Sequence, residues 1–391
     1  MQDSRPLCYN AQYIISRKSL LHAPEEKGSP EASPEIQHRP GTEVSRMKKA
    51  LITGVNGQDG TYLAELLLGM GYSVAGAYRK TSTPAFWRLE EKGILHSPGF
   101  SLVELDLTDL GGCLRVVSET EPGTIFNLAA QSFVGLSFRE PVTTATVNGL
   151  GVMNLLEAIR IVDPKIRFYQ ASSSEMFGCT VDGRPHTEES LFHPRSPYAV
   201  SKAFAHWATI NYRESYGLFT CCGILFNHES PLRSKDFVTR KISSAVAEIS
   251  LGKRDFLSLG NMDVVRDWGY APEYITAMER MTALPSPEDF VVATGKANSL
   301  RSFVELAFRA IGRRIIWKGS GVEETGVDAE NGRELVRVDP AFFRPCEIEC
   351  VVGDASKASR ILGWEPRTGL DEICRIMVET DIRRIQAGFP F

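Results

Sequence analysis

One tyrosine and one lysine, Tyr198 and Lys202, have a spacing that suits proton transfer from a hydroxyl group. They form the only Tyr-x-x-x-Lys pattern in the chain, and residues four apart share one face of a helix. A lysine charge on that face would lower the pKa of the phenol, which is about 10 when unperturbed. A tyrosinate can then accept a proton from an alcohol while hydride leaves the same carbon. The spacing by itself also arises by chance.

Two further polar residues, Ser173 and Glu175, end an apolar run that reads RFYQASSSE. In an extended segment they would point to the same side, toward the crevice where open α/β sheets bind ligands. Ser173 can hydrogen-bond a reacting oxygen. Glu175 can remove a proton from the carbon beside a ketone and assist departure of hydroxide, which hydride transfer alone does not need. A strand-end cap and a surface carboxylate are the alternative interpretations.

A glycine-rich segment, ALITGVNGQDG, stands where a first strand would pass into a helix. Glycines let a pyrophosphate approach the backbone at the helix N-terminus, where a Cβ would block the approach or the tight turn. We therefore expect Gly54, Gly57 and Gly60 to bind a dinucleotide. An ordinary strand-to-helix turn is the alternative.

The end of the second predicted strand, Tyr78-Arg79-Lys80, discriminates between the nicotinamide cofactors. An NAD site usually has an acidic residue here, which bonds the ribose hydroxyls. Arg79 can instead pair with a 2′-phosphate, so the sequence favours NADP; a solvated surface arginine is the alternative. Asp106, after the third strand, could meet the adenine edge or cap the following helix.

Short apolar runs alternate with amphipathic helical stretches from Ala50 onward. The runs are ALIT, SVAGAY, SLVEL, TIFNLAA, RFYQASS and FTCCGILF. Apolar strands separated by helices indicate a parallel sheet covered on both faces. We therefore predict an α/β fold with a doubly wound parallel-sheet Rossmann domain and a smaller α/β C-terminal lobe. Residues 47–226 would bind NADP, with some later segments returning to that domain, and residues 227–391 would mainly bind substrate.

Three segments outside this alternation carry separate expectations. Residues 1–46 are expected to be a disordered extension, because the stretch from Ala23 to Arg46 is rich in Pro, Glu and Ser. Met47 would then be the functional start. FVVAT and the helix from Leu300 to Ile311 fit either the sheet or the lobe, and the turn-rich region from Lys318 to Pro345 is expected to be loops that cover a ligand.

Composition excludes several other classes. A net charge of -4 and a sequence pI near 6.1 do not indicate a surface that binds nucleic acid or a membrane. The eight cysteines have no metal-binding spacing, so we expect no metal and reduced thiols in the cytoplasm. We find no uninterrupted apolar run of the roughly 20 residues that a membrane span needs.

Several motifs together resemble the extended short-chain dehydrogenases, and within them the GDP-mannose 4,6-dehydratase family, from Met47 almost to the C-terminus. They are TGVNGQDG, RSPYAVSK, GILFNHESP, FVTRKI, GNMDVVRDWGYA, FRPCEIE and GDASKASRILGWEP. The last is shared broadly among extended members, whereas FNHESP with RDWG is much narrower. The resemblance implies NADP-dependent dehydration of GDP-mannose to GDP-4-keto-6-deoxymannose, with hydride passing from sugar carbon 4 to carbon 6. It also implies a homodimer or homotetramer.

The resemblance further implies roles for individual residues. Ser173 fills a position that is usually Thr, Glu175 is the acid/base, Tyr198 accepts the proton, and Lys202 binds the ribose and tunes Tyr198. Further cofactor contacts are implied for Gln58, Asp59, Leu107, Leu128, Ala129, Ala130, Gln131, His228 and Arg233. The GDP-sugar would contact Ser132, Ser173, Glu175, Asn227, Lys241, Arg266, Arg344 and Glu347. Where the family usually has an aromatic residue before TAD, this chain has Thr143-Thr144-Ala145-Thr146, which removes an expected tyrosine contact to the cofactor.

Two other functions share most of these features. A nucleotide-sugar 4-epimerase or 4-keto-sugar reductase has the same glycines and Tyr-Lys pair, but these enzymes as a group lack the Glu beside the catalytic Ser or Thr. A catalytically silent NADP-binding protein typically loses the Tyr-Lys pair, which is intact here. Fold alone does not decide among them.

Overall fold

The structure of the protein is a computed structural model that describes residues 48–83, 85–180, 183–342 and 348–389. The expectations for residues 1–46 and for Met47 lie outside the described residues. Everything below concerns the compact unit that follows them.

A seven-stranded parallel sheet forms the centre of the fold, in the order β11-β6-β5-β4-β1-β2-β3. Its strands are β1 (Lys49–Thr53), β2 (Ser73–Tyr78), β3 (Phe100–Glu104), β4 (Thr124–Asn127), β5 (Arg167–Ser173), β6 (Thr220–Leu225) and β11 (Phe290–Val292). The strand order reverses between β1 and β4, and such a switch point opens a crevice at the carboxyl ends of the strands. The predicted doubly wound sheet is confirmed, and the FVVAT strand lies at its edge beside β6.

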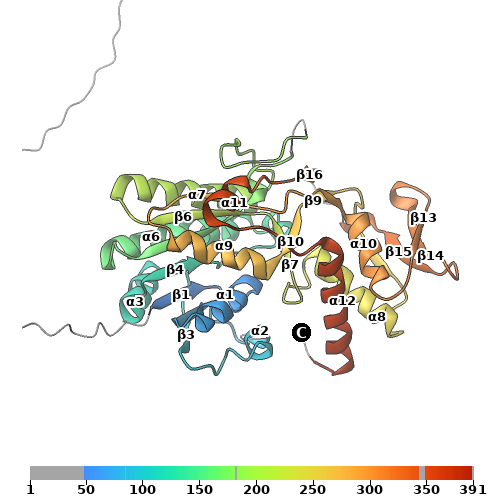
Figure 1. The fold of residues 1–391 in the computed structure, drawn as a ribbon, viewed down its shortest axis with the longest axis horizontal. Coiled ribbons are helices and arrows are strands. Elements are labelled where there is room, and N and C mark those ends of the chain that lie inside the picture. The colour runs from blue at the N-terminus through green and yellow to red at the C-terminus, as the bar shows by residue number, and fades with distance from the viewer. Residues whose placement is uncertain (1–47, 84, 181–182, 343–347, 390–391) are drawn as a thin grey trace, which may run out of the picture. The chain divides into compact units, whose positions relative to one another are not determined.

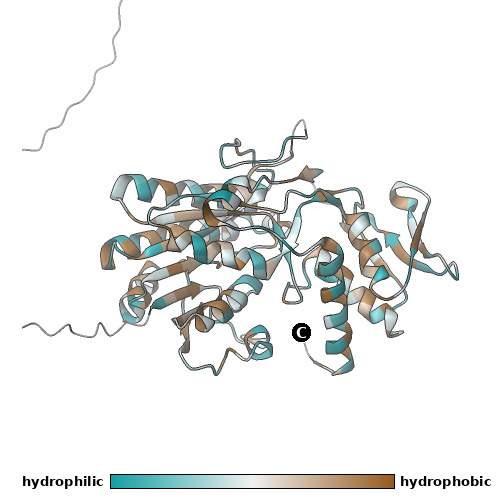
Figure 2. Ribbon diagram, viewed as in Figure 1, coloured by the Kyte–Doolittle hydropathy of each residue, from teal (hydrophilic) through white to brown (hydrophobic). Residues whose placement is uncertain are grey.

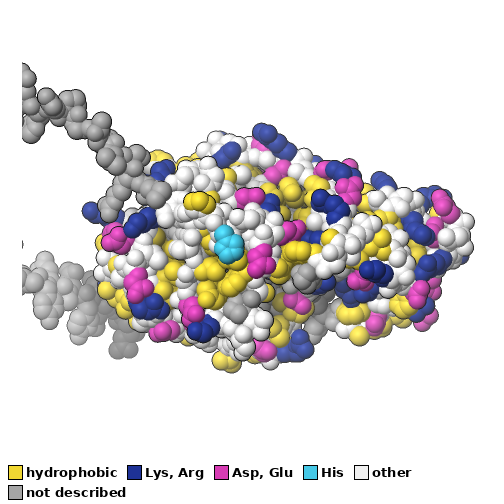
Figure 3. All heavy atoms as spheres, turned by 90° about the horizontal axis from the view of Figure 1, so that it is seen from below, with side chains coloured by type: hydrophobic (Ala, Val, Ile, Leu, Met, Phe, Trp, Pro, Cys, Tyr) yellow, Lys and Arg dark blue, Asp and Glu magenta, His cyan; other side chains and the backbone are white. Residues whose placement is uncertain are grey.

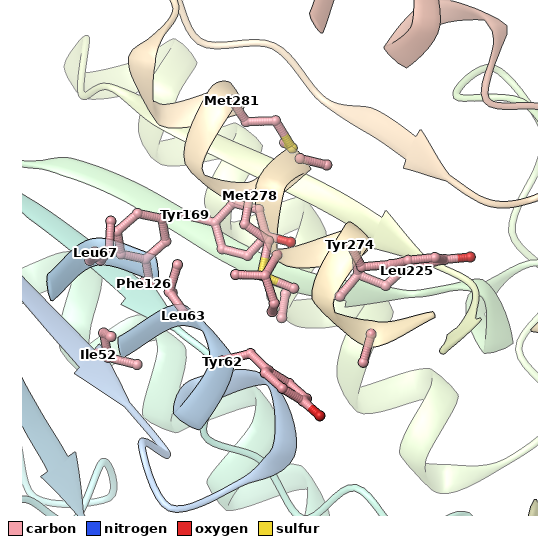
Figure 4. Packing of buried hydrophobic residues seen from close by; sticks show 14 of the residues in the cluster. Ile52, Tyr62, Leu63, Leu67, Phe126, Tyr169, Leu225, Tyr274, Met278 and Met281 are labelled. Carbon is pink, nitrogen blue, oxygen red and sulfur yellow. The ribbon is translucent and has the colours of Figure 1, made fainter. Parts of the chain in front are cut away.

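Helices cover both faces of the sheet, and neighbouring strand residues divide between the two cores. On one face lie α1 (Gln58–Gly69) and α9 (Ala271–Ala283); on the other lie α3 (Leu110–Thr120), α6 (Gly151–Val162) and α7 (Pro197–Tyr216). Phe126 and Tyr169 pack toward α1 and α9, as Figure 4 shows, while Ile125 and Phe168 belong to the opposite core. In Figure 2 the central strands are accordingly apolar.

A second core is built mainly from the C-terminal half of the chain. Helices α8 (Val238–Ser250), α10 (Leu300–Arg309) and α12 (Leu370–Gln386) share this core with a four-stranded sheet, β13-β14-β15-β8. The strands are β8 (Leu257–Leu259), β13 (Ile315–Lys318), β14 (Thr325–Asp328) and β15 (Glu334–Val338). The predicted smaller α/β lobe is confirmed, and α10 belongs to it.

The expectation of covering loops between Lys318 and Pro345 is wrong where β14 and β15 lie, and residues 343–345 lie outside the described residues. Strands β13, β14 and β15 pair as antiparallel neighbours, and apolar residues of β13 and β15 pack in the second core. Turns join these strands, and within the described residues of this region a 3-10 turn at Pro340–Phe342 reaches the cavity described below.

Short strands connect the two cores. Strand β7 (Asn227–Glu229) pairs with β10 (Trp268–Tyr270), and β9 (Val265–Arg266) lies between β12 (Asn298–Ser299) and β16 (Cys350–Val351). These pairs bring the residues after β6 and before α9 to the carboxyl edge of the large sheet.

One helical stretch, Pro141–Val162, meets the length and composition criterion for crossing a membrane, with a mean hydropathy of 1.2. The stretch is not an uninterrupted apolar run, because it contains Glu157 and Arg160, so this finding does not contradict the expectation from the sequence. The stretch comprises α5 (Pro141–Ala145), a π-turn (Thr146–Leu150) and α6, and it packs against α3 and α7. Core helices of globular proteins pass the same test.

On the face drawn in Figure 3, acidic and basic side chains are interspersed.

Candidate active site

A cavity of about 820 Å³ lies at the carboxyl edge of the large sheet, within the size range of small-molecule sites. All four catalytic candidates line it: Ser173, Glu175, Tyr198 and Lys202. So do other candidates from the sequence, namely Asp59, Leu128, Ala130, Ser132, Asn227, His228, Arg233, Lys241 and Arg266. The structure thus brings together residues that are up to 207 positions apart, from Asp59 to Arg266.

The glycine loop between β1 and α1 has no room for side chains. Gly54 has φ +68°, and a Cβ there would lie 2.9 Å from the Cα of Ala129. A Cβ on Gly60 would lie 2.6 Å from the Cα of Val55. Gly57 is the N-cap of α1, with no side-chain cap, so free N–H groups point out of the helix end. This cradle fits the pyrophosphate of a dinucleotide.

A buried row of polar side chains fixes the strand ends behind this loop. The Thr53 hydroxyl donates to Asn127 Oδ1 at 2.6 Å, and Asn127 Nδ2 donates to Gln170 Oε1 at 2.8 Å. The same Thr53 oxygen accepts hydrogen bonds from the backbone N–H groups of Leu128 and Ala129. The carboxyl ends of β1, β4 and β5 are therefore held in one arrangement by groups that water cannot reach.

Asp59 and His228 form an ion pair beside the glycine loop. His228 Nε2 lies 2.9 Å from Asp59 Oδ2. Burial alone would raise the pKa of Asp59, but the charge and hydrogen bond of His228 outweigh it and hold that pKa at about 2. Burial alone would lower the pKa of His228, and Asp59 raises it above its usual range. Gln58 joins the same elements, because its amide donates to the His228 carbonyl at 3.1 Å and accepts from Ser230 at 2.8 Å.

The catalytic candidates come from β5 and α7. Ser173 Oγ accepts the backbone N–H of Glu175 at 3.3 Å, and the Ser173 side chain acts to lower the pKa of Tyr198. Lys202 Nζ donates to the Ala171 carbonyl at 2.8 Å and lies 5.9 Å from the centroid of the Tyr198 ring. The predicted close arrangement of the four side chains is what the structure has.

The expected lowering of the Tyr198 pKa is wrong for this arrangement. Tyr198 is 8% exposed, and burial raises its pKa to about 12, partly offset by the hydrogen bond with Ser173. Burial likewise lowers the pKa of Lys202 to about 8. The lysine charge is directed to the Ala171 carbonyl rather than to the phenol oxygen.

The candidates for substrate contact approach the cavity from the second core. The Lys241 ammonium lies 3.3 Å from the centroid of the Phe342 ring, and burial lowers its pKa. Arg266 is buried and donates to the Ile348 carbonyl at 2.6 Å. Asn227 begins β7. Arg344 and Glu347 lie outside the described residues.

The remaining cofactor candidates do not line the cavity: Gly54, Gly57, Gln58, Gly60, Arg79, Asp106, Leu107, Ala129 and Gln131. Arg79 is exposed, and no partner for its guanidinium occurs in the described part of the chain, whereas Lys80 pairs with Glu104. Asp106 accepts from the N–H of Thr108 at 2.9 Å. The residue that precedes α3 as its N-cap is Asp109, so Asp106 holds a local turn and does not cap the helix.

Sequence reasoning missed an aromatic part of the cavity wall. Phe133 and Phe237 meet edge to face with centroids 6.2 Å apart, and the guanidinium of Arg233 lies 3.6 Å over the Phe237 ring. Phe342 also lines the cavity. Phe133 follows Ser132 and Phe237 is the first residue of the FVTRKI motif, so both are next to predicted site residues. Their contact could not be predicted, because the two segments are far apart in the sequence.

The parallel sheet, the glycine cradle and the helix carrying Tyr198 and Lys202 define an enzyme of the extended short-chain dehydrogenase class, which uses bound NAD(P). Sequence comparison gives a narrower assignment. The model of the GDP-mannose 4,6 dehydratase family matches residues 51–377. The chain belongs to the GDP-mannose 4,6-dehydratase family, a family of lyases.

Individual relatives agree with this assignment. The chain is 49% identical to a GDP-mannose 4,6-dehydratase of Sinorhizobium fredii (strain HH103), over 86% of this chain and 97% of the relative. It is 45% identical to a GDP-mannose 4,6 dehydratase of Homo sapiens, over 87% of this chain and 92% of the relative. Its fold is similar to that of a dTDP-glucose 4,6-dehydratase from Bacillus anthracis solved with NAD, with a TM-score of 0.72, 20% identity, and coverage of 87% and 98%.

Proposed function

We propose that this protein converts GDP-mannose to GDP-4-keto-6-deoxymannose through Ser173, Glu175, Tyr198 and Lys202. The observation that carries this proposal is the placing of a carboxylate, Glu175, in one cavity with the Tyr198–Lys202 pair and the glycine cradle. Oxidation and reduction of a sugar need only the pair, whereas loss of water from carbons 5 and 6 needs a further acid/base.

Bound nicotinamide would supply the chemistry that takes hydride from carbon 4 of the mannose and returns it at carbon 6. Tyr198 accepts the proton of the 4-hydroxyl, and Ser173, which lines the same cavity, orients the same oxygen. Because a 4-ketone acidifies the hydrogen on carbon 5, Glu175 removes that proton and gives it to the departing 6-hydroxyl, which leaves as water. When hydride is added at carbon 6, Tyr198 returns its proton to carbon 5, so the net change is the loss of one water.

A tyrosine whose pKa is about 12 is protonated at neutral pH and must lose its own proton before it can accept another. A nearby cation favours that loss, because it lowers the pKa of the phenol. Lys202 is the cation that we propose for this task, because it lies on the same face of α7. Contact between the Lys202 ammonium and a ribose hydroxyl would place the ammonium between the cofactor and the Tyr198 phenol.

The Thr-to-Ser difference at residue 173 keeps the hydroxyl and removes a methyl group that restricts its rotamer.

We propose NADP as the cofactor, with residues 47–226 binding it and residues 227–391 mainly binding GDP-mannose. Arg79 directly follows β2 and has an exposed guanidinium and no ion-pair partner within the described residues, as a 2′-phosphate site requires. His228 and Arg233 would face the phosphates from the other side of the glycine cradle. Lys241 and Arg266 supply positive charge for the GDP pyrophosphate.

We propose that the chain works as a homodimer or homotetramer in the cytoplasm. An apolar face that no element of the described residues covers runs over α5, the π-turn, α6 and α7, which pack together. Its exposed residues are Val142, Leu150, Ile161, Val200, Phe204, Trp207 and Tyr216. Large exposed apolar patches mark association surfaces. Light scattering of Trp207→Glu should show a smaller species than the parent protein.

The first experiment is incubation of purified protein with GDP-mannose and no added reductant, followed by mass analysis of the sugar nucleotide. Loss of one water without net NADPH consumption is the expected result. Net turnover of NADPH in a parallel incubation to which it is added would identify a reductase, and an isomer of unchanged mass would identify an epimerase. Inertness toward all nucleotide hexoses despite bound NADP would leave a silent binder.

A further inference from the structure

The turn that carries Arg233 is buried and is held by side chains from two distant helices. Ser230, Pro231 and Leu232 are all buried, and the N–H of Arg233 bonds back to the Ser230 carbonyl at 3.1 Å. The carbonyl groups of Pro231 and Leu232 need donors, since a buried unpaired carbonyl is costly.

Arg88 supplies the first donor and reaches a second segment at the same time. It lies on α2 (Trp87–Glu91). Its Nε donates to the Leu232 carbonyl at 2.6 Å, and its Nη1 donates to the Asn56 carbonyl at 3.1 Å. Asn56 belongs to the glycine loop and Leu232 adjoins Arg233, so one guanidinium joins the two halves of the phosphate cradle.

Arg384 of α12 holds the neighbouring carbonyl. Its Nη1 donates to the Pro231 carbonyl at 2.6 Å, and its Nη2 pairs with Glu91 Oε2, also at 2.6 Å. Both guanidinium groups lie over the Trp87 ring, with Arg88 4.4 Å and Arg384 5.1 Å from its centroid. Helix α2 therefore positions both donors: it carries Arg88, and its Trp87 and Glu91 contact Arg384.

We infer that Arg88 is a positioning residue for the cofactor: it sets the separation between the glycine loop and Arg233 without touching the cofactor. Arg384, through Glu91 and Pro231, keeps the turn in register with α2. A planar guanidinium with donors on two edges can bridge two carbonyls at fixed spacing, which a lysine cannot do. The inference rests on the proposed contact of the glycine loop and Arg233 with the cofactor phosphates.

The test compares Arg88→Gln and Arg88→Lys with Glu90→Gln, an exposed change on the same short helix. NADPH affinity is measured by fluorescence titration, GDP affinity by calorimetry and folding by thermal melting. We expect NADPH binding to weaken by about tenfold in Arg88→Gln, roughly 1.4 kcal/mol, and by less in Arg88→Lys. GDP affinity should stay within about twofold of the parent, and Glu90→Gln should match the parent throughout.

Two results would overturn the inference. Equal NADPH affinity in Arg88→Gln and the parent protein would do so, as would equal losses of NADPH and GDP affinity, which indicate a general loss of structure. If Arg88→Gln does not fold, NADPH affinity is instead measured in Arg88→Lys and Glu91→Gln, because both substitutions keep a polar side chain at the altered position. Equal affinity in both variants and in the parent protein would then overturn the inference. Failure of the parent protein itself to bind NADPH would instead count against the proposed function.

Discussion

The two walls of the candidate site are held in different ways. The cofactor wall, consisting of the Gly54–Gly60 loop and the carboxyl ends of β1 and β4, is tied by buried or partly buried side chains to β5, β7 and α2. The sugar-nucleotide wall consists of Asn227, Lys241, Arg266 and Phe342. Asn227 and Arg266 lie on strands of two or three residues, Lys241 lies on α8, and Phe342 lies on a 3-10 turn. Phe342 there is 50% exposed.

The difference indicates a division of labour between the walls. A site held by many satisfied buried groups loses little entropy on binding and keeps its ligand. This suits a cofactor that ends each cycle as it began. The other wall must admit and release a sugar nucleotide at every turnover, and Phe342, an exposed side chain on a 3-10 turn, can move without exposing a buried group.

The largest expected effect lies where the walls meet, at Glu175. Glu175→Gln keeps the shape and removes the base, so dehydration should fall by about 10³-fold, while slow oxidation at carbon 4 persists. Mass analysis of product and absorbance of transient NADPH measure the two steps. Glu189→Gln, an exposed change nearby in sequence, should be unaffected. Full dehydration with oxidation abolished would show that the roles are assigned wrongly.

The second prediction concerns the stiffness of the cofactor wall. The carboxylate of Asp59 has its pKa lowered from 3.8 to about 2, so its contribution, about 2 kcal/mol, is present above pH 4 and lost as pH falls toward 2. His228 has its pKa raised above 6.5, so its contribution is present below 6.5 and lost as pH rises beyond the raised value.

Asp59→Asn should therefore lower the melting temperature most between about pH 4 and 6.5, measured without added ligand. The gap between variant and parent should close as the pH falls toward 2. A gap of constant size from pH 2 to 9 would show that the ion pair does not stiffen this wall.

The third prediction tests cofactor choice on the same wall. Arg79→Gln should weaken NADPH binding by about tenfold, the typical loss of a charge-assisted hydrogen bond, and leave NADH binding unchanged. Fluorescence titration with both cofactors measures the ratio. Lys80→Gln is the control, since Lys80 already pairs with Glu104. Equal losses for NADPH and NADH would place Arg79 away from the 2′-phosphate.

The smallest effect is expected on the sugar-nucleotide wall. Lys241→Met keeps the chain length and removes a half-buried charge, so KM for GDP-mannose should rise by about fivefold with kcat nearly constant. Lys253→Met, an exposed change beyond the end of α8, is the matched control. A fall in kcat at constant KM would contradict a role in binding and would weaken the contrast between the walls.

Local chemistry made the cofactor loop and the catalytic helix predictable. Glycine spacing and a residue pair four apart are properties of single segments, and the structure places Gly54 and Lys202 as expected. The row from Thr53 through Asn127 to Gln170 was not predictable, because its partners are 74 and 43 positions apart. Strands β13 to β15 were missed because glycines and charges obscure strands whose stability comes from pairing and burial.

Arg384 also bears on the order in which the cofactor wall can form during synthesis. It lies on α12 and holds the carbonyl of Pro231, 153 positions earlier. A ribosome releases the strands of the large sheet and the glycine loop before it releases this arginine, because they precede α12 in the chain. The sheet can therefore begin to fold during translation, whereas the turn before Arg233 gains this hydrogen bond only after α12 has emerged from the ribosome.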